Sequence, residues 1–380
     1  NSLWAWAGGL GVSRDHGIVS SAYGVYRVRD TSRLHPHFLN EFLRSASFNW
    51  ELQVRSKGIW ISRLQLTDDA FLDAPILLPP PDEQAAIVRF LDHVNRRIDR
   101  FLRAKKRLIA LLNEQKQAII HRAVTRGLDP DVAMKDSGVP WLGDVPAHWQ
   151  LQRLKSISNL VTSGSRGWAR YYSDAGPLFL RIGNISTTSI DLRLERRTYV
   201  QPPPDTEGER TRVIENDVLL SITAQIGAVG VVPDGLGEAY VNQHTALIRL
   251  RTDRLAARWI AYVLLSRFGK DQCRLLTNGG TKVGLTLDDV RSLAILIPPF
   301  EEQCRLVADI ERQTVELERT LGWAERESDV IREYRARLTA DVVTGQLDVR
   351  EAAAHLPDEE PEPLDDIGVD DEAEAEDCVE

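Results

Sequence analysis

The chain is poor in cysteine and methionine and lacks any long apolar run. Its three cysteines, Cys273, Cys304 and Cys378, are too few and too widely spaced for a disulfide framework or a metal site with close ligand spacing. No apolar run reaches the roughly 18 residues that cross a bilayer, and no signal-peptide pattern opens the sequence. We therefore expect a reducing, cytoplasmic setting.

Residues 351–380 lack lysine and arginine altogether. They contain fourteen aspartates or glutamates, so this tail is strongly acidic. Although the net charge of the whole chain is −9, residues 1–350 are therefore mildly basic. The tail is interrupted by prolines and has few apolar residues, which predicts disorder. A basic body permits a nucleic-acid partner without requiring one.

An internal repeat organises the rest of the chain. The string PPPDEQ at 79–84 recurs as PPFEEQ at 298–303, an offset of 219 residues. The offset holds without a gap for about fifty residues, until Leu128-Asp129 falls on Leu347-Asp348. The chain therefore carries one structural module twice.

Each copy predicts one long helix, over residues 79–129 and 298–348. Apolar residues recur every seven positions, which is typical of a coiled-coil seam. Prolines suit each helix start, and Gly127 and Gly345 suit the ends. The expected packing residues are Leu91, Ile98, Leu112 and Ile119 in the first helix and Ile310, Leu317, Ile331 and Leu338 in the second. A second stripe of the first helix would hold Val94, Phe101 and Leu108, and Lys105 and Gln115 would lie on its seam.

A globular block of residues 145–297 precedes the second helix, after a linker at 130–144. Short apolar strands with turn residues between them predict an α/β or α+β domain. The expected strands lie near residues 178–182, 218–222, 229–232 and 246–250, and a helix is expected from about Ala256 to Phe268.

Residues 1–78 resemble only the second half of that block. Val19–Arg29 matches the strand pattern of Val241–Arg251, and a helix around Phe38–Arg44 matches the one around Trp259–Leu265. Roughly 75 residues are therefore missing from the front of the first block by comparison with the second. Since the single methionine is Met134, we expect a fragment, or a gene whose start has been lost.

The order block, long helix, block, long helix closely resembles the specificity subunit of type I restriction–modification systems. Each block runs into its helix through ILLPPPDEQ or ILIPPFEEQ. GVPWLGDVPAHW at 138–149 is similar to that family's entry to a target recognition domain, and WAWAGGLGV at 4–12 to a stretch inside the first such domain. The resemblance covers about residues 1–350.

The resemblance implies that each block reads one half of a bipartite sequence in double-stranded DNA. The long helices would pack antiparallel, set the separation of the blocks and dock two methyltransferase subunits, and a restriction or motor subunit would join them. The chain itself would be non-catalytic and need no cofactor or metal. S-adenosylmethionine would belong to the methyltransferase, and ATP and Mg to the motor.

Loops of the blocks carry residue types suited to DNA. SGSRGWARYY at 163–172 is small, basic and aromatic, which suits phosphate or guanine contacts as well as an ordinary exposed loop. Asn184 suits adenine recognition or a turn, and a cation beside glycine in both blocks suits a phosphate clamp. His244 fits a structural role better than a contact. The candidate DNA-binding residues are Arg166, Arg170, Tyr171, Tyr172, Arg181, Asn184, Gln225, Gln243, Lys282, Lys57 and Arg63.

Three alternatives compete with this interpretation. A DNA methyltransferase needs an N-P-P-F or D-P-P-Y loop, but the nearest string is IPPF at 297–300, and no Walker motif or Gly-rich cofactor loop is found. A coiled-coil protein scaffold without DNA recognition would show the same helices. A truncated gene would yield an inactive remnant or a half-site subunit.

Overall fold

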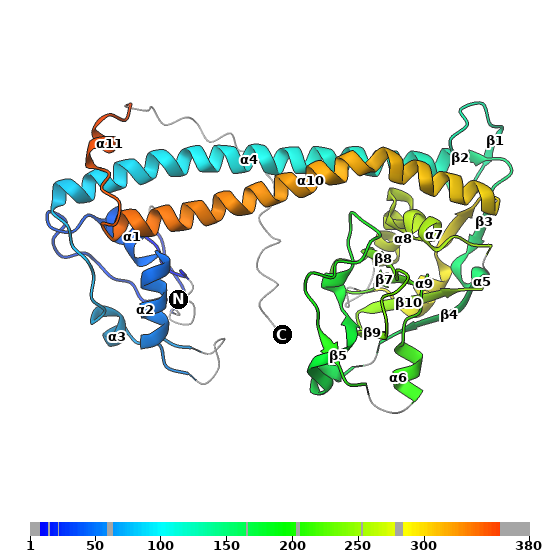
Figure 1. Ribbon diagram of the computed structural model, residues 1–380, viewed down its shortest axis with the longest axis horizontal. Coiled ribbons are helices and arrows are strands. Elements are labelled where there is room, and N and C mark those ends of the chain that lie inside the picture. The colour runs from blue at the N-terminus through cyan, green and yellow to red at the C-terminus, as the bar shows by residue number, and fades with distance from the viewer. Residues whose placement is uncertain are drawn as a thin grey trace. The chain divides into compact units, whose positions relative to one another are not determined.

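The computed structural model describes residues 8–13, 16–21, 23–58, 64–164, 166–202, 206–251, 254–277 and 284–357. The chain divides into a first unit, Asn1–Ala104 with Glu327–Glu380, and a second unit, Lys105–Arg326. Each unit contains part of two long helices, α4 (Pro81–Arg126) and α10 (Phe300–Val343), labelled in Figure 1. Within the described ranges no helix is long and apolar enough to span a membrane.

The first unit is helical in its described part. Its short helices are α1 (Pro36–Leu43), α2 (Ala46–Arg55), α3 (Asp68–Leu72) and α11 (Arg350–Ala354). Ser45 and Thr67 begin α2 and α3 by accepting hydrogen bonds from the backbone N–H of Phe48 and Ala70. The core packs Phe38, Phe42, Phe48 and Leu52 against Ile87 and Leu91 of α4 and Val342 and Val343 of α10.

Two sequence expectations were wrong in this unit. Described residues of Val19–Arg29 form no strand, and Ile18 and Val25 are 102% and 79% exposed. The reason is the lack of neighbours: the matching strand of the second unit pairs with strands from the front of its block, which have no described counterpart here. Disorder from residue 351 was also wrong for α11, whereas residues 358–380 lie outside the described part.

The second unit is built on an antiparallel sheet of four strands. Its order is β4 (Ser158–Ser163), β10 (Thr245–Leu250), β7 (Val218–Ser221) and β8 (Val229–Val231). A second sheet places β5 (Tyr172–Leu180) between β6 (Tyr199–Val200), antiparallel, and β9 (Ala239–Val241), parallel. The expected strands are therefore present, and the mixed pairing is that of an α+β domain.

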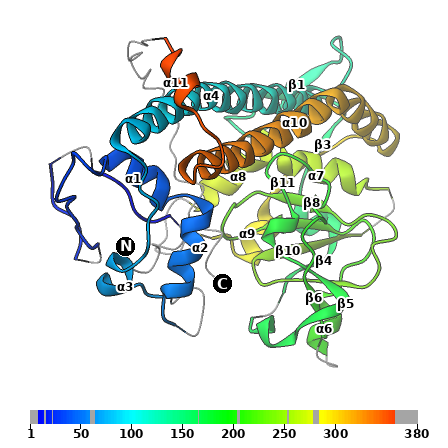
Figure 2. The ribbon, with the colours of Figure 1, turned by 60° about the vertical axis from the view of Figure 1, so that its left-hand side comes forward.

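Helices cover these strands beneath the long helices (Figure 2). The expected helix from Ala256 to Phe268 is in fact two, α7 (Ala257–Leu265) and α8 (Arg267–Thr277), which are separated at the buried Ser266. The core forms where Trp149 meets Trp259 edge to face at 5.6 Å, and the indole N–H of Trp259 donates to Leu296 O at 2.8 Å. Around it lie α5 (Leu154–Ile157), α9 (Leu287–Ser292), β3 (Gln150–Arg153) and β11 (Ala294–Ile297), whereas α6 (Thr206–Thr211) contacts β4 and β9.

The segment expected to be a linker at 130–144 contains secondary structure. Strand β1 (Met134–Asp136) pairs antiparallel with β2 (Asp144–Pro146), so the chain makes a small hairpin before it enters the second block. The turn between them includes Gly138 and Gly143, both at positive φ.

The long helices run antiparallel within each unit, as expected. In the first unit Asp99 forms an ion pair with Arg335, while Leu91 packs near Val343. In the second unit Lys116 Nζ lies 2.6 Å from Glu318 Oε1, while Ile120 packs in one core with Leu306 and Ile310. The predicted packing residues are buried (Leu91, Ile98, Ile310) or half-buried (Leu112, Ile119, Leu317, Ile331, Leu338).

The predicted second stripe of α4 was wrong beyond Phe101. Leu108 is 37% exposed and Gln115 is exposed, whereas Ile109 is half-buried and Lys116 is buried. A straight α-helix has 3.6 residues per turn, so a strict seven-residue count drifts by about 20° per heptad. The buried stripe has accordingly moved by one residue.

Candidate nucleic-acid interface

The glutamine of each PPxxEQ string attaches a block to its long helix. Gln84 and Gln303 are both almost completely buried. Their side-chain nitrogens donate to Pro79 O at 2.8 Å and to Pro298 O at 2.9 Å, respectively. Their side-chain oxygens accept from the backbone N–H of His35 at 2.7 Å and of Ala256 at 3.0 Å, the residues that precede α1 and α7. The same joint therefore occurs in both units.

A glutamate of the second string makes a further attachment. Glu302 accepts a hydrogen bond from the indole N–H of Trp149 at 3.1 Å, and its other oxygen lies 2.8 Å from Nε2 of His148. Both partners belong to the string that enters the second block. Consequently the start and the end of this block are both fixed on the first turn of α10.

Several loops meet at one end of the four-stranded sheet. Because the strands are antiparallel, β4 and β7 end where β10 begins. The N–H of Gly164 donates to Asn242 O at 3.1 Å, and that of Ile222 donates to His244 O at 3.0 Å. We call the described loop residues 164, 166–171, 222–228 and 242–244 the loop edge.

Two more segments join the loop edge. The N–H of Asn242 donates to Leu180 O at 3.0 Å, which places Arg181 next to the loop at 242–244. The N–H of Leu285 donates to Ile222 O at 2.7 Å, so Leu285 also lies at the loop edge. Lys282 lies outside the described residues, as does Arg63.

An aromatic cluster supports the first loop. Trp168 begins the 3₁₀ helix η3 (Trp168–Tyr171), and its ring is buried and stacked on Phe179 at 5.7 Å and 15°. Arg170 is exposed and lies over the ring of Tyr171 at 4.8 Å. Tyr172 is 44% exposed, and Arg166 is also exposed. Arg166, Arg170 and Tyr172 are therefore accessible to solvent, where they can contact a nucleic acid.

A short hydrogen-bond chain orients Gln243. Its side-chain nitrogen lies 2.9 Å from Nε2 of His244, whose Nδ1 lies 2.9 Å from the hydroxyl of Thr223. His244 thus has the structural role expected of it, but this role serves the candidate beside it. Gln225 is exposed at φ +54°, a left-handed conformation that points to a tightly constrained loop.

Asn184 has a structural role. Its side-chain oxygen accepts from Arg181 N at 2.9 Å, and its nitrogen donates to Arg193 O at 2.7 Å and Arg196 O at 3.1 Å. The residue is 7% exposed and its amide is fully engaged, which argues against a base contact. Arg181 is half-buried beside it.

Lys57 stands apart from these residues, in the first unit. It is exposed and forms an isolated bridge with Gln65.

Sequence reasoning did not identify Trp168 or Thr223 as functional residues. The burial of a loop tryptophan and a hydrogen bond between residues 21 positions apart leave no local pattern in the sequence. Nowhere in the described ranges do three His, Cys, Asp or Glu residues come together as metal ligands would.

Comparison with known proteins gives consistent matches. Residues 199–320 match the family model of the type I restriction modification DNA specificity domain. A putative type I restriction enzyme MjaX specificity subunit of Methanocaldococcus jannaschii is 22% identical over 329 residues, covering 84% of this chain and 70% of that protein. The type I restriction enzyme EcoBI specificity subunit of Escherichia coli is 24% identical over 257 residues, covering 65% of this chain and 53% of its own length. The chain thus spans about half the length of this second relative.

Among solved structures, a chain from a type I R-M system is similar over 84% of this chain and 73% of its own length. The two share 20% sequence identity and superpose with a TM-score of 0.49.

Proposed function

We propose that the chain is a non-catalytic specificity subunit of a type I restriction–modification system and selects the DNA sequence on which partner subunits act, because residues 199–320 match that family's DNA specificity domain and two such subunits are similar to the chain. The observation that carries this proposal is the loop edge. Candidates predicted separately from the sequence, Arg166, Gln225 and Gln243, come from three loops that hydrogen bonds join at one end of a sheet. Loops fixed on a rigid sheet are suited to base recognition.

The candidate side chains divide into two kinds of contact. Arg166 and Arg170 are exposed cations that suit phosphate oxygens or guanine, while Gln243 and Gln225 present amides that suit adenine. The His244–Thr223 chain restricts the rotamer of Gln243 before DNA arrives. A preorganised amide loses less entropy on binding, which favours selection between bases.

We propose a bipartite target because the joint between block and helix occurs twice. In each unit the antiparallel helices have one block attached at the start of one helix. The described part of the first block contains Lys57 as its candidate contact. A half-site or inactive subunit would instead follow if this block cannot bind DNA.

Exposed apolar residues along α10 support docking of two methyltransferase subunits. Val315 and Trp323 of the second unit are 53% and 56% exposed, and Val330 and Tyr334 of the first unit are 63% and 52% exposed. Large apolar side chains exposed on one helix favour contact with a partner when they form a continuous surface. S-adenosylmethionine, and the ATP and Mg of a restriction subunit, would be bound by those partners in the cytoplasm.

Methylome sequencing of cells with and without the gene tests this function. We expect a bipartite methyl-adenine motif that disappears on deletion, and Gln243→Ala should relax one position of the motif. Gln346→Ala, an exposed glutamine at the end of the second helix module, is the matched control. If the folded full chain binds no duplex DNA even at low salt, the scaffold alternative replaces this proposal.

A further inference from the structure

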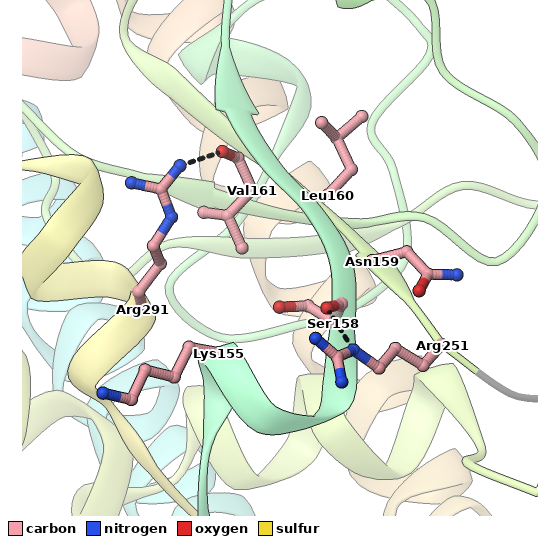
Figure 3. Close-up of a pocket in the computed structure, with 7 residues that line it drawn as sticks. All are labelled: Lys155, Ser158, Asn159, Leu160, Val161, Arg251 and Arg291. Atoms are coloured by element: carbon pink, nitrogen blue, oxygen red, sulfur yellow. Dashed lines mark hydrogen bonds between the residues drawn. The ribbon is translucent and has the colours of Figure 1, made fainter.

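A basic pocket opens in the second unit where α5, β4 and α9 meet (Figure 3). It has a volume of about 270 Å³, and its lining includes three cations and no acid. The lining residues are Lys155, Ser158, Asn159, Leu160, Val161, Arg251 and Arg291. We call it the edge pocket because β4 is the outermost strand of its sheet.

Two arginines are held in place by the edge strand itself. Arg251 Nε donates to Ser158 O at 2.8 Å, and Arg291 Nη2 donates to Val161 O at 2.9 Å (Figure 3). Arg291 also forms an ion pair with Asp288 at 2.8 Å. A guanidinium has five N–H donors, so both side chains keep donors beyond those that hold them.

Of the three remaining polar side chains, Ser158 donates to Leu154 O and the other two are unengaged. Lys155 and Asn159 are exposed, and neither side chain has a hydrogen bond or ion pair with any residue the structure describes. Of the three cations that line the pocket, Arg291 forms an ion pair with a carboxylate, that of Asp288. The pocket therefore carries excess positive charge. By donating to carbonyl groups of the edge strand, Arg251 and Arg291 also protect that strand from pairing with other strands, which accounts for the two arginines but not for Lys155.

We propose that the edge pocket binds a phosphate of the DNA backbone, away from the bases that the loop edge reads. Two fixed guanidinium groups, an ammonium and an amide supply the donors that a phosphodiester needs. Asn159 on β4 and Gly164, the residue after β4, are five positions apart in the sequence, or about 16 Å of extended chain. At 3.4 Å per phosphate along one strand, this separation corresponds to about five nucleotides. The inference rests on the proposed DNA-binding function.

Binding of the full chain to a mixed-sequence duplex, measured over a range of salt concentrations, tests the proposal. Lys155→Gln should weaken binding about three- to tenfold and reduce the slope of log affinity against log salt by about 0.9, since one phosphate contact is lost. Asn159→Asp keeps every cation but places a carboxylate at the phosphate site, and should weaken binding at least as much. Neither change removes a described bond, so folding should be unaffected.

Arg305→Gln is the matched control, because Arg305 is an exposed cation on α10 without a partner among the residues described. It should leave the salt slope unchanged. If both pocket variants bound the duplex with an unchanged slope of log affinity against log salt, the proposal that the edge pocket binds a phosphate would be overturned. The proposed function of the chain would not be affected. Absence of duplex binding by the unaltered, folded chain would overturn both.

The side-chain amide signal of Asn159 in NMR distinguishes other occupants. We expect the duplex to shift this signal. A shift with inorganic phosphate but not with the duplex would make this a small-anion site and overturn the proposal. A shift on removal of residues 358–380, with none on adding duplex, would assign the pocket to the acidic tail and overturn it as well.

Discussion

The side-chain oxygen of Gln303 accepts a hydrogen bond from the backbone N–H of Ala256 at 3.0 Å, at the start of α7. The same contact joins Gln84 to His35 at 2.7 Å. Each glutamine is buried and also donates to the proline carbonyl before its helix. A single side chain thus fixes three backbone segments.

Gln303→Ala should destabilise the second unit by about 2–4 kcal/mol, because it leaves a buried N–H and a buried carbonyl without partners. Hydrogen exchange should accelerate at Ala256 and not at His35, and Gln84→Ala should give the reverse. Gln313→Ala, at an exposed position on α10, is the control. If the backbone amide of Ala256 were equally protected from hydrogen exchange in Gln303→Ala and in the control, the role of Gln303 in joining the block to α10 would be contradicted.

The pair Lys116–Glu318 should respond asymmetrically to mutation. Lys116 is 3% exposed, whereas the Glu318 side chain is 42% exposed. Glu318→Gln leaves a buried charge and should cost about 1–3 kcal/mol, while Lys116→Met should be neutral or stabilising. Urea denaturation of both variants checks this. A larger loss for Lys116→Met than for Glu318→Gln would show that the ion pair itself stabilises the helices.

Stability should fall below about pH 6.5 because of His121. Burial lowers the pKa of His121 from 6.5, and the charge of Arg267 lowers it further. The folded state therefore binds a proton less readily than the unfolded state, so stability is complete above the unfolded pKa and is lost as the pH falls. Comparison of thermal unfolding at pH 7.5 and 5.5 should show a smaller drop for His121→Gln than for the unaltered chain. His16→Gln, an exposed control, should keep the full drop.

Gly164→Ala should disrupt the loop edge. A Cβ at this position would lie 2.0 Å from Val241 O and 2.5 Å from Asn242 O, so the loop at 242–244 must move. We expect loss of DNA binding by at least about tenfold with the helical circular dichroism preserved. Gly183→Ala is matched in chemistry, but nothing lies within 4 Å of its added Cβ, and it should bind normally. Equal DNA affinities for the two variants would remove the loop edge from the DNA interface.

The long helices were predictable because heptad spacing is a local pattern, whereas their antiparallel pairing was expected only from the family resemblance. Strands could be placed wherever apolar runs met turn residues, as at β7 and β10. The pattern at Val19–Arg29 failed because a strand needs neighbours, and those of β10 come from residues 158–163 and 218–221. Leu108 was misplaced because a seven-residue count ignores the drift of a straight helix.

The candidate site was predictable only in part, for a similar reason. Residue type and turn context identified Arg166, Gln225 and Gln243, which the structure brings to one edge. The same criteria selected Asn184, whose amide instead holds its own loop through three backbone contacts. The edge pocket was missed because its cations lie at 155, 251 and 291, far apart in the sequence, and only the pairing of β4 with β10 and its packing against α9 bring them together.

Gln84 and Gln303 form hydrogen bonds to backbone atoms of their blocks. A backbone N–H is the same whatever side chain its residue carries, so these hydrogen bonds make no demand on the identity of the residues that donate them. A block with altered loops can therefore be joined to an unchanged helix. On the proposed function, such a block would bring a different DNA preference without any compensating change in the part that partner subunits would contact.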